Sequence, residues 1–218
     1  MTQELSTAGA RTAPTAASLC DALAEIGLAD TTIPDLQTTL PRAFAGPAVT
    51  MRMRALEPGE SADPAPYWAY FDSLSAGAVL VIACEDKSIT ALGGVASSTA
   101  VARGAAGAVT DCLIRDVEEI GGYGFPVRFA GARPSVRRGA FVEIGEPVEV
   151  AGVTVSAGDL VVADADGIVV VPSARTEAVL ERAAAIDEWE EAWAAASRER
   201  RSISQGYMDC RDLPGRGH

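Results

Sequence analysis

The sequence has little that would bind a soft metal or support a histidine-based nucleophile. Its one histidine, His218, is the last residue, and no two of its four cysteines have C-x-x-C spacing. Histidine-rich zinc sites and Ser-His or Cys-His nucleophile pairs are therefore strongly disfavoured. Any metal has to be bound by carboxylates and water, which indicates a hard cation such as Mg²⁺ or Mn²⁺.

Basic residues and long apolar runs are also scarce. With 18 Lys and Arg against 30 Asp and Glu, the net charge is −12, which argues against a nucleic-acid partner. No apolar run approaches the about 18 residues that a membrane span needs, and the N-terminus does not have the pattern of a signal peptide. We therefore predict a cytoplasmic protein with reduced thiols and no membrane partner.

The chain does have enough apolar residues to bury a core, since they make up 48% of its 218 residues. We predict a flexible N-terminal arm at residues 1–14, a single domain at 15–200 and a tail at 201–218.

Two patterns of secondary structure follow one another along the predicted domain. A helix Leu19 to Ile26 capped by Ser18, a strand at 48–56 and a helix at 66–74 lead into buried strands at 78–83 and 106–109, which alternate with helices at 95–102 and 116–120. After Pro126 the sequence predicts short β segments at 127–130, 141–144, 148–150, 153–155, 160–163 and 168–171. The first pattern favours a parallel, helix-covered sheet, and Asp166-Gly167 suits a hairpin turn.

A long helix is expected from about Ser173 onward. Its apolar residues recur every three or four positions, so one stripe must be buried. The stripe comprises Val179, Ala183, Ile186, Trp189 and Trp193. Because this helix is acidic and carries two tryptophans, we expect it to pack beyond its own domain, in a homotrimer or a hexamer.

The stretch from Ala91 to Asp116, ALGGVASSTAVARGAAGAVTDCLIRD, carries the candidate site. Gly93 and Gly94 precede a helix, whose free amides at Val95 and Ala96 are expected to bind a carboxylate or phosphate. Arg115 can bind an anion through two nitrogens, and Asp116 can hold a divalent cation without histidine.

Three segments carry a further pattern: ARGAAGAVTDCLIRDVEEI, FPVRFAGARPS and GVTVSAGDLVVADADGIVVVPSARTEAVLERA. Together they resemble the RraA-like superfamily, which includes 4-hydroxy-4-methyl-2-oxoglutarate aldolases and oxaloacetate decarboxylases. The resemblance implies an α/β/β/α swivelling-domain fold, here with a long C-terminal helix, that assembles as trimers or hexamers. It also implies a divalent-metal-dependent lyase acting on a small pyruvyl-type 2-oxo acid.

The resemblance also implies roles for individual residues. Arg115 and Asp116 correspond to the pair that holds pyruvate and the metal, and the amides of Val95 and Ala96 to those that bind the pyruvate carboxylate. The family's aldolases have an acidic residue where this chain has Gly94. A further acidic residue of a neighbouring subunit is matched by Glu188, Glu190 or Glu191.

Gly94 leaves two interpretations open. In one, Glu85, Asp86 or Asp111 takes over proton transfer, or the chain catalyses an easier decarboxylation that needs no such base. In the other, the chain is a non-catalytic protein that regulates a partner by contact, as some members of the superfamily inhibit a ribonuclease. We expect Cys112 to be a small buried residue, not a nucleophile.

Overall fold

A computed structural model describes residues 14–28, 31–33, 36–135 and 137–216. The chain divides into two compact units, one of Met1–Gly27 with Glu177–His218 and the other of Leu28–Thr176. The arm predicted at residues 1–14 lies almost wholly outside the described residues. Our boundaries of 15–200 for a single domain stay a prediction.

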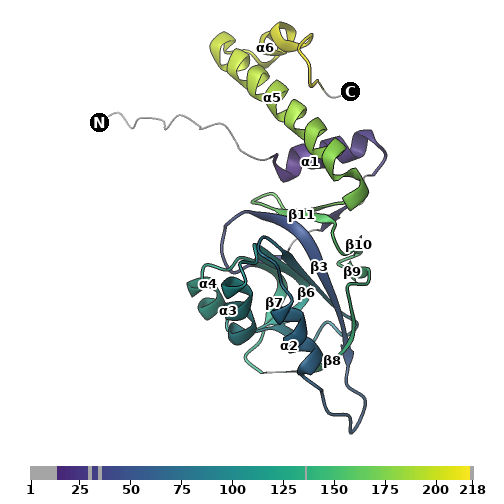
Figure 1. The fold of residues 1–218 in the computed structure, drawn as a ribbon. Coiled ribbons are helices and arrows are strands. Elements are labelled where there is room, and N and C mark those ends of the chain that lie inside the picture. The colour runs from purple at the N-terminus through teal and green to yellow at the C-terminus, as the bar shows by residue number, and fades with distance from the viewer. Residues whose placement is uncertain (1–13, 29–30, 34–35, 136, 217–218) are drawn as a thin grey trace, which may run out of the picture. The chain divides into compact units, whose positions relative to one another are not determined.

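The larger unit is built on a sheet to which ten of the described strands belong (Figure 1). Its centre consists of four neighbouring parallel strands, β3 (Phe44–Ala55), β4 (Val79–Cys84), β6 (Gly107–Ile114) and β7 (Val127–Ala132). β4 is buried along its whole length, because both faces of the sheet are covered there. The predicted parallel centre is therefore confirmed.

Antiparallel strands extend the sheet on both sides. Beside β3 come β11 (Leu160–Ala163), β12 (Ile168–Val171) and β1 (Thr32–Ile33), and beside β7 comes β2 (Gln37–Thr38). β8 (Gly139–Ile144) pairs with β3, while β5 (Thr90–Leu92) pairs in parallel with β6. The hairpin predicted around Asp166-Gly167 is formed by β11 and β12.

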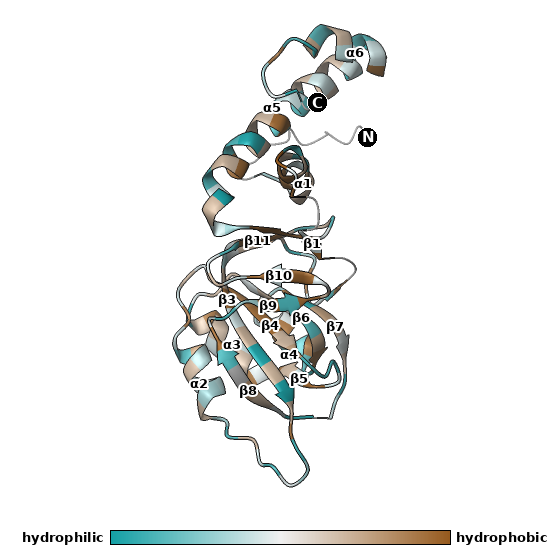
Figure 2. Cartoon of the chain, turned by 90° about the vertical axis from the view of Figure 1, so that its right-hand side faces the viewer, coloured by the Kyte–Doolittle hydropathy of each residue, from teal (hydrophilic) through white to brown (hydrophobic). Residues whose placement is uncertain are grey.

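Each face of the sheet packs against a different layer. On one face, the core residues of the strands lie against α2 (Ala65–Asp72), α3 (Gly94–Ala102) and α4 (Val117–Gly122). On the other, Val79, Val81 and Val109 pack against the hairpin of β9 (Val148–Val150) and β10 (Val153–Val155). Hydrophobic colour in Figure 2 gathers on strands of these inner layers, near β4 and β10. The predicted α/β class is confirmed.

The smaller unit contains α1 (Ala16–Glu25), α5 (Thr176–Arg200) and α6 (Ile203–Cys210). α1 begins one turn earlier than predicted: Thr15 is its N-cap, and Ser18 completes a capping box from inside the helix. α5 is the long C-terminal helix that the sequence predicted. None of the described helices is long and apolar enough to span a membrane.

The two tryptophans of α5 pack on α6, a helix that lies in the segment predicted to be a tail. Trp189 Nε1 donates to the Cys210 carbonyl at 2.9 Å, Trp193 Nε1 donates to the Ile203 carbonyl at 3.1 Å, and Tyr207 contacts both rings. This packing occurs within one chain, so the tryptophans no longer argue for a trimer or hexamer. The assembly itself stays a prediction.

Candidate functional site

The Gly-Gly turn lies at one side of a cavity of about 710 Å³ in the larger unit. Gly93 is the N-cap of α3, and Gly93, Val95, Ala96 and Arg115 all line the cavity. Within the described part of the chain the amides of Val95 and Ala96 have no acceptor, as is usual for the first turn of a helix. Apart from Gly94, the structure thus brings the predicted substrate-binding residues together.

Arg115 and Asp116 hold each other and the turn. The Arg115 backbone amide donates to the Leu92 carbonyl at 3.0 Å, and the Arg115 side-chain Nε lies 3.2 Å from Asp116 Oδ2. The same Oδ2 accepts the Gly94 amide at 3.0 Å. A methyl group added at Gly93 would lie 3.0 Å from Arg115 Nε, so glycine leaves the room that this pair needs.

Asp116 adopts an unusual backbone conformation where β6 leads into α4. Its φ is 60°, in the left-handed region that few residues other than glycine adopt. The contacts with Arg115 and Gly94 hold it there. Such conformations gather at functional sites, where neighbouring contacts offset the strain.

A second carboxylate lies where the sequence seemed to have none. A methyl group added at Gly94 would lie 2.6 Å from Oε2 and 2.8 Å from Oε1 of Glu119, which therefore occupies the space that an acidic side chain at position 94 would take. Sequence reasoning missed Glu119. The signal was its spacing, because a residue three positions after Asp116 lies on the same side of the first helical turn.

Tyr123 fixes the orientation of Glu119. Its hydroxyl donates to Glu119 Oε1 from one turn further along the helix. That hydrogen bond, then burial and the nearby charges of Glu119 and Asp116, raise the pKa of the Tyr123 phenol. The phenol therefore keeps its proton at neutral pH and remains a donor to the carboxylate.

The donor set fits a hard cation that keeps most of its water. Among the described residues no group of three or more His, Cys, Asp and Glu is placed to hold a metal ion. Asp116 Oδ1 and Glu119 Oε2 nevertheless have no hydrogen bond to any described residue, and both carboxylates lie against Gly94. Mg²⁺ is commonly bound by one or two carboxylates with water completing its coordination.

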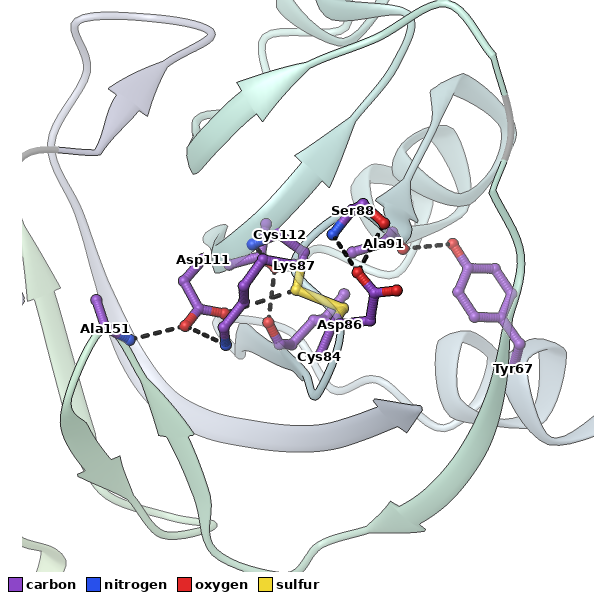
Figure 3. The surroundings of a disulfide bond; sticks show 11 residues. Tyr67, Cys84, Asp86, Lys87, Ser88, Ala91, Asp111, Cys112 and Ala151 are labelled. Carbon is purple, nitrogen blue, oxygen red and sulfur yellow. Dashed lines mark hydrogen bonds and ion pairs between the residues drawn. A yellow bond between two sulfur atoms is a disulfide. The ribbon is translucent and has the colours of Figure 1, made fainter. Parts of the chain in front are cut away.

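Asp111, a predicted catalytic residue, does not line this cavity. It lies within β6, which continues to Ile114, and its Oδ2 is 2.5 Å from Lys87 Nζ (Figure 3). The same oxygen accepts the Ala151 amide at 2.9 Å. Ala151 has a φ of 48° in the two-residue turn between β9 and β10, so Asp111 anchors that hairpin on the face of the sheet away from the helices.

The expectation of reduced thiols is wrong for two of the four cysteines. Cys84 of β4 and Cys112 of β6 form a disulfide across adjacent parallel strands, with a Cα separation of 6.1 Å (Figure 3). Cys112 is fully buried, as predicted, but as half of this bond. The two residues face the same core, so the fold brings together cysteines that are 28 positions apart.

The other predicted carboxylates have partners elsewhere. Glu85 pairs with Arg52 at 3.6 Å, while Asp86 pairs with Arg137 at 2.6 Å and accepts hydrogen bonds from Ser88 that lower its pKa. Neither lines the cavity. Asp116 and Glu119 do not line it either, but both lie against Gly94 at its edge, and Asp116 pairs with Arg115, which does line it. The three candidates on α5, Glu188, Glu190 and Glu191, are exposed in the smaller unit.

Similar proteins share this fold and this sequence pattern. A candidate 4-hydroxy-4-methyl-2-oxoglutarate aldolase of Halalkalibacterium halodurans is 33% identical over 111 residues, which are 50% of this chain and 53% of that protein. This chain thus spans about half the length of these curated relatives.

Two solved structures have the same fold over most of the chain. An uncharacterised protein of Pseudomonas syringae superposes with a TM-score of 0.80 at 26% identity, over 90% of both chains. RraAS2 of Streptomyces coelicolor, described as an unusual member of the RNase ES inhibitor RraA protein family, has a TM-score of 0.72 at 28% identity, over 81% of this chain and 89% of that one. The family model described as RraA-like, Aldolase/RraA, matches residues 16–170, and the chain therefore belongs to this family.

Proposed function

We propose that this protein is a divalent-metal-dependent lyase that cleaves a carbon–carbon bond in a pyruvyl-type 2-oxo acid. The observation that carries the proposal is the pair of carboxylates, Asp116 and Glu119, which both lie against Gly94, with Asp116 also paired with Arg115. Asp116 would hold Mg²⁺ or Mn²⁺, and the negative charge of Glu119 beside it would strengthen the binding. When bound, such a cation supplies a Lewis acid beside the 2-oxo group.

The substrate carboxylate is bound by Arg115 and the first turn of α3. The Arg115 Nη atoms have no acceptor among the described residues, and a guanidinium can bind a planar carboxylate through two parallel hydrogen bonds. The amides of Val95 and Ala96 at the N-terminus of α3 also favour negative charge. Together they place the 2-oxo group beside the two carboxylates.

Glu119 takes the proton in an aldol cleavage. Its carboxylate accepts the proton of the 4-hydroxyl group, the C3–C4 bond breaks, and the electron pair moves into the 2-oxo acid, whose C3 then takes a proton to give pyruvate. General bases of this kind typically accelerate a reaction about 10²- to 10⁴-fold. Decarboxylation of a 2-oxo-dicarboxylate leaves CO₂ instead and does not need this base.

The test compares Glu119→Gln with Glu118→Gln, a matched control on the same helix whose side chain is also exposed. Pyruvate release from 4-hydroxy-4-methyl-2-oxoglutarate should require added Mg²⁺ or Mn²⁺ and should fall about 10²-fold in Glu119→Gln only. Calorimetry should show weaker Mn²⁺ binding in the same variant. Metal-independent release, or equal activity and metal binding in both variants, would contradict the proposal.

Gly94→Asp provides a second test. In the wild-type chain an added carboxylate has to displace Glu119, so the single substitution should give no gain. In the Glu119→Ala background the space is vacant, and Gly94→Asp should recover part of the lost activity and Mn²⁺ affinity. Absence of any recovery in a folded double variant would argue against a role for a carboxylate at this place.

A second candidate function is regulation of a partner protein by contact. The likeness to RraAS2, whose family is named for inhibiting RNase ES, favours it. A protein with this role needs no metal and releases no pyruvate. The metal-dependent assay therefore separates the two candidates, and inhibition of a ribonuclease in the absence of pyruvate release would support the second.

A further inference from the structure

One wall of the cavity beside Arg115 is aromatic. The ring of Tyr67 in α2 lies 4.7 Å from that of Phe71 and 5.1 Å from that of Phe141 in β8, between centroids, and all three residues line the cavity. The Tyr67 hydroxyl donates to the Ala91 carbonyl at 3.2 Å (Figure 3). Because that hydroxyl is already used and burial raises its pKa, Tyr67 offers the cavity an uncharged ring.

Trp68 adds an exposed ring to the same lining. Its side chain is 61% exposed, and its indole N–H has no acceptor within the described ranges of the chain. Large aromatic side chains usually bury most of their surface and use their polar atom. A tryptophan that does neither, at the side of a cavity, is typical of a surface that a ligand covers.

The size and charge of the cavity indicate what the ligand carries. About 710 Å³ lies within the range of about 300 to 1,000 Å³ for pockets that bury drug-sized ligands, and pyruvate is far smaller. Besides Arg115, the charged residues of the lining are Arg138 and Asp72, whose charges cancel. The end of the ligand away from Arg115 therefore meets apolar surface with no net charge.

We propose that the substrate is a 2-oxo acid whose far end carries an aromatic group, such as a 4-aryl-4-hydroxy-2-oxo acid. This inference rests on the lyase function proposed above and specifies its substrate class. Arg115 binds the carboxylate, and the rings of Tyr67, Trp68 and Phe141 bind the aryl group. A retro-aldol cleavage of such a compound releases pyruvate and an aromatic carbonyl compound.

Three unreactive probes with one head group test this class by calorimetry in the presence of Mn²⁺. Oxamate carries the head group alone, N-phenyloxamate adds an aromatic ring, and N-oxalylglycine adds a second carboxylate. Burial of a ring of this size should make N-phenyloxamate bind about tenfold to a hundredfold more tightly than oxamate. N-oxalylglycine should gain less than N-phenyloxamate.

Substitutions at Trp68 locate the ring in the cavity. Because Trp68 is largely exposed, its replacement should leave the fold intact. Trp68→Ala should remove most of the advantage of N-phenyloxamate over oxamate, while Trp68→Phe should retain it. Met208→Ala, which shortens an exposed apolar side chain in the smaller unit, should change neither affinity.

The outcomes distinguish this inference from the function on which it rests. Equal affinity for oxamate and N-phenyloxamate, or tightest binding of N-oxalylglycine, overturns the aromatic class and leaves the lyase in place. An unchanged preference for N-phenyloxamate in Trp68→Ala also overturns it. Absence of binding by all three probes, oxamate included, overturns the lyase proposal and this inference together.

Discussion

Two carboxylates near the end of β6 differ in how many partners they have. Asp111 is 8% exposed, and one of its oxygens contacts both Lys87 and the Ala151 amide. Asp116 is exposed, and its Oδ1 has no partner among the described residues. Five positions along one chain thus separate an acid that holds a hairpin from an acid that remains available for a ligand.

The difference shows which property indicates function here. A buried carboxylate lowers the free energy of the fold only when its hydrogen bonds are made, so Asp111 is explained by the structure alone. At Asp116, the left-handed backbone and the unused oxygen are not explained by packing. Substitution of Asp116 should therefore lower activity, whereas substitution of Asp111 should lower the free energy of unfolding.

The largest effect is expected for Asp116→Asn. The amide keeps the size of the side chain but removes the charge, so pyruvate release should fall about 10²- to 10³-fold, as for loss of a charge-stabilising group in other enzymes. Urea unfolding should show little change in the free energy of unfolding. A loss of stability that accounts for the lost activity would place Asp116 with Asp111 as a structural residue.

The next effect concerns the disulfide that joins β4 to β6. Replacing Cys84 and Cys112 together by serine removes a link between residues 28 positions apart, which should lower the free energy of unfolding by roughly 2 to 4 kcal/mol. Urea unfolding with and without reductant measures it, and Cys20→Ser is the control. Equal stability of wild type and double variant under oxidising conditions, or four titratable thiols in the folded protein, would show that the bond is not formed.

Asp111→Asn should cost less, roughly 1 to 3 kcal/mol of unfolding free energy. The amide can still accept the Ala151 amide, but it leaves Lys87 without its ion pair, and Lys87 is half exposed to water, which limits the loss. Activity per folded molecule should remain within a few-fold of wild type. A loss of activity as large as that of Asp116→Asn, with stability unchanged, would restore the catalytic role first predicted for Asp111.

Much of the fold was predictable because its pattern is local. The continuous apolar run of β4 and the residues around Asp166-Gly167 indicate their structures without knowledge of distant contacts. β5 and α6 were missed, since β5 is defined by its pairing with β6 and α6 is stabilised by Trp189 and Trp193 of α5. The disulfide was missed because its pairing depends on which strands become neighbours.

The candidate site was predicted in part for the same reason. Gly93, Val95, Ala96 and Arg115 are close in space because they end or begin neighbouring elements, which the pattern of strands and helices indicates. Glu119 was missed because its spacing from Asp116 was not considered, and because the sequence does not show that its side chain in α4 fills the space beside Gly94 of α3. The aromatic wall was missed because Tyr67 and Phe141 come from distant segments.

The smallest effect is expected for Tyr123→Phe, which changes Glu119 without removing it. The Tyr123 pKa is raised, chiefly by its hydrogen bond to Glu119, so the neutral phenol is favoured in the folded protein. The stability that this hydrogen bond contributes is fully present below the ordinary tyrosine pKa of about 10 and is lost as the pH rises through the higher value.

Near neutral pH, removal of the Tyr123 hydroxyl frees Glu119 to move, and pyruvate release should fall only a few-fold. Above the raised pKa a tyrosinate would repel Glu119 and Asp116, so the alkaline loss of activity should be steeper in the wild type than in the variant. Rate profiles between pH 6 and 11 measure this, with Tyr207→Phe in the smaller unit as control, and identical profiles for Tyr123→Phe and wild type would show that Tyr123 does not position Glu119.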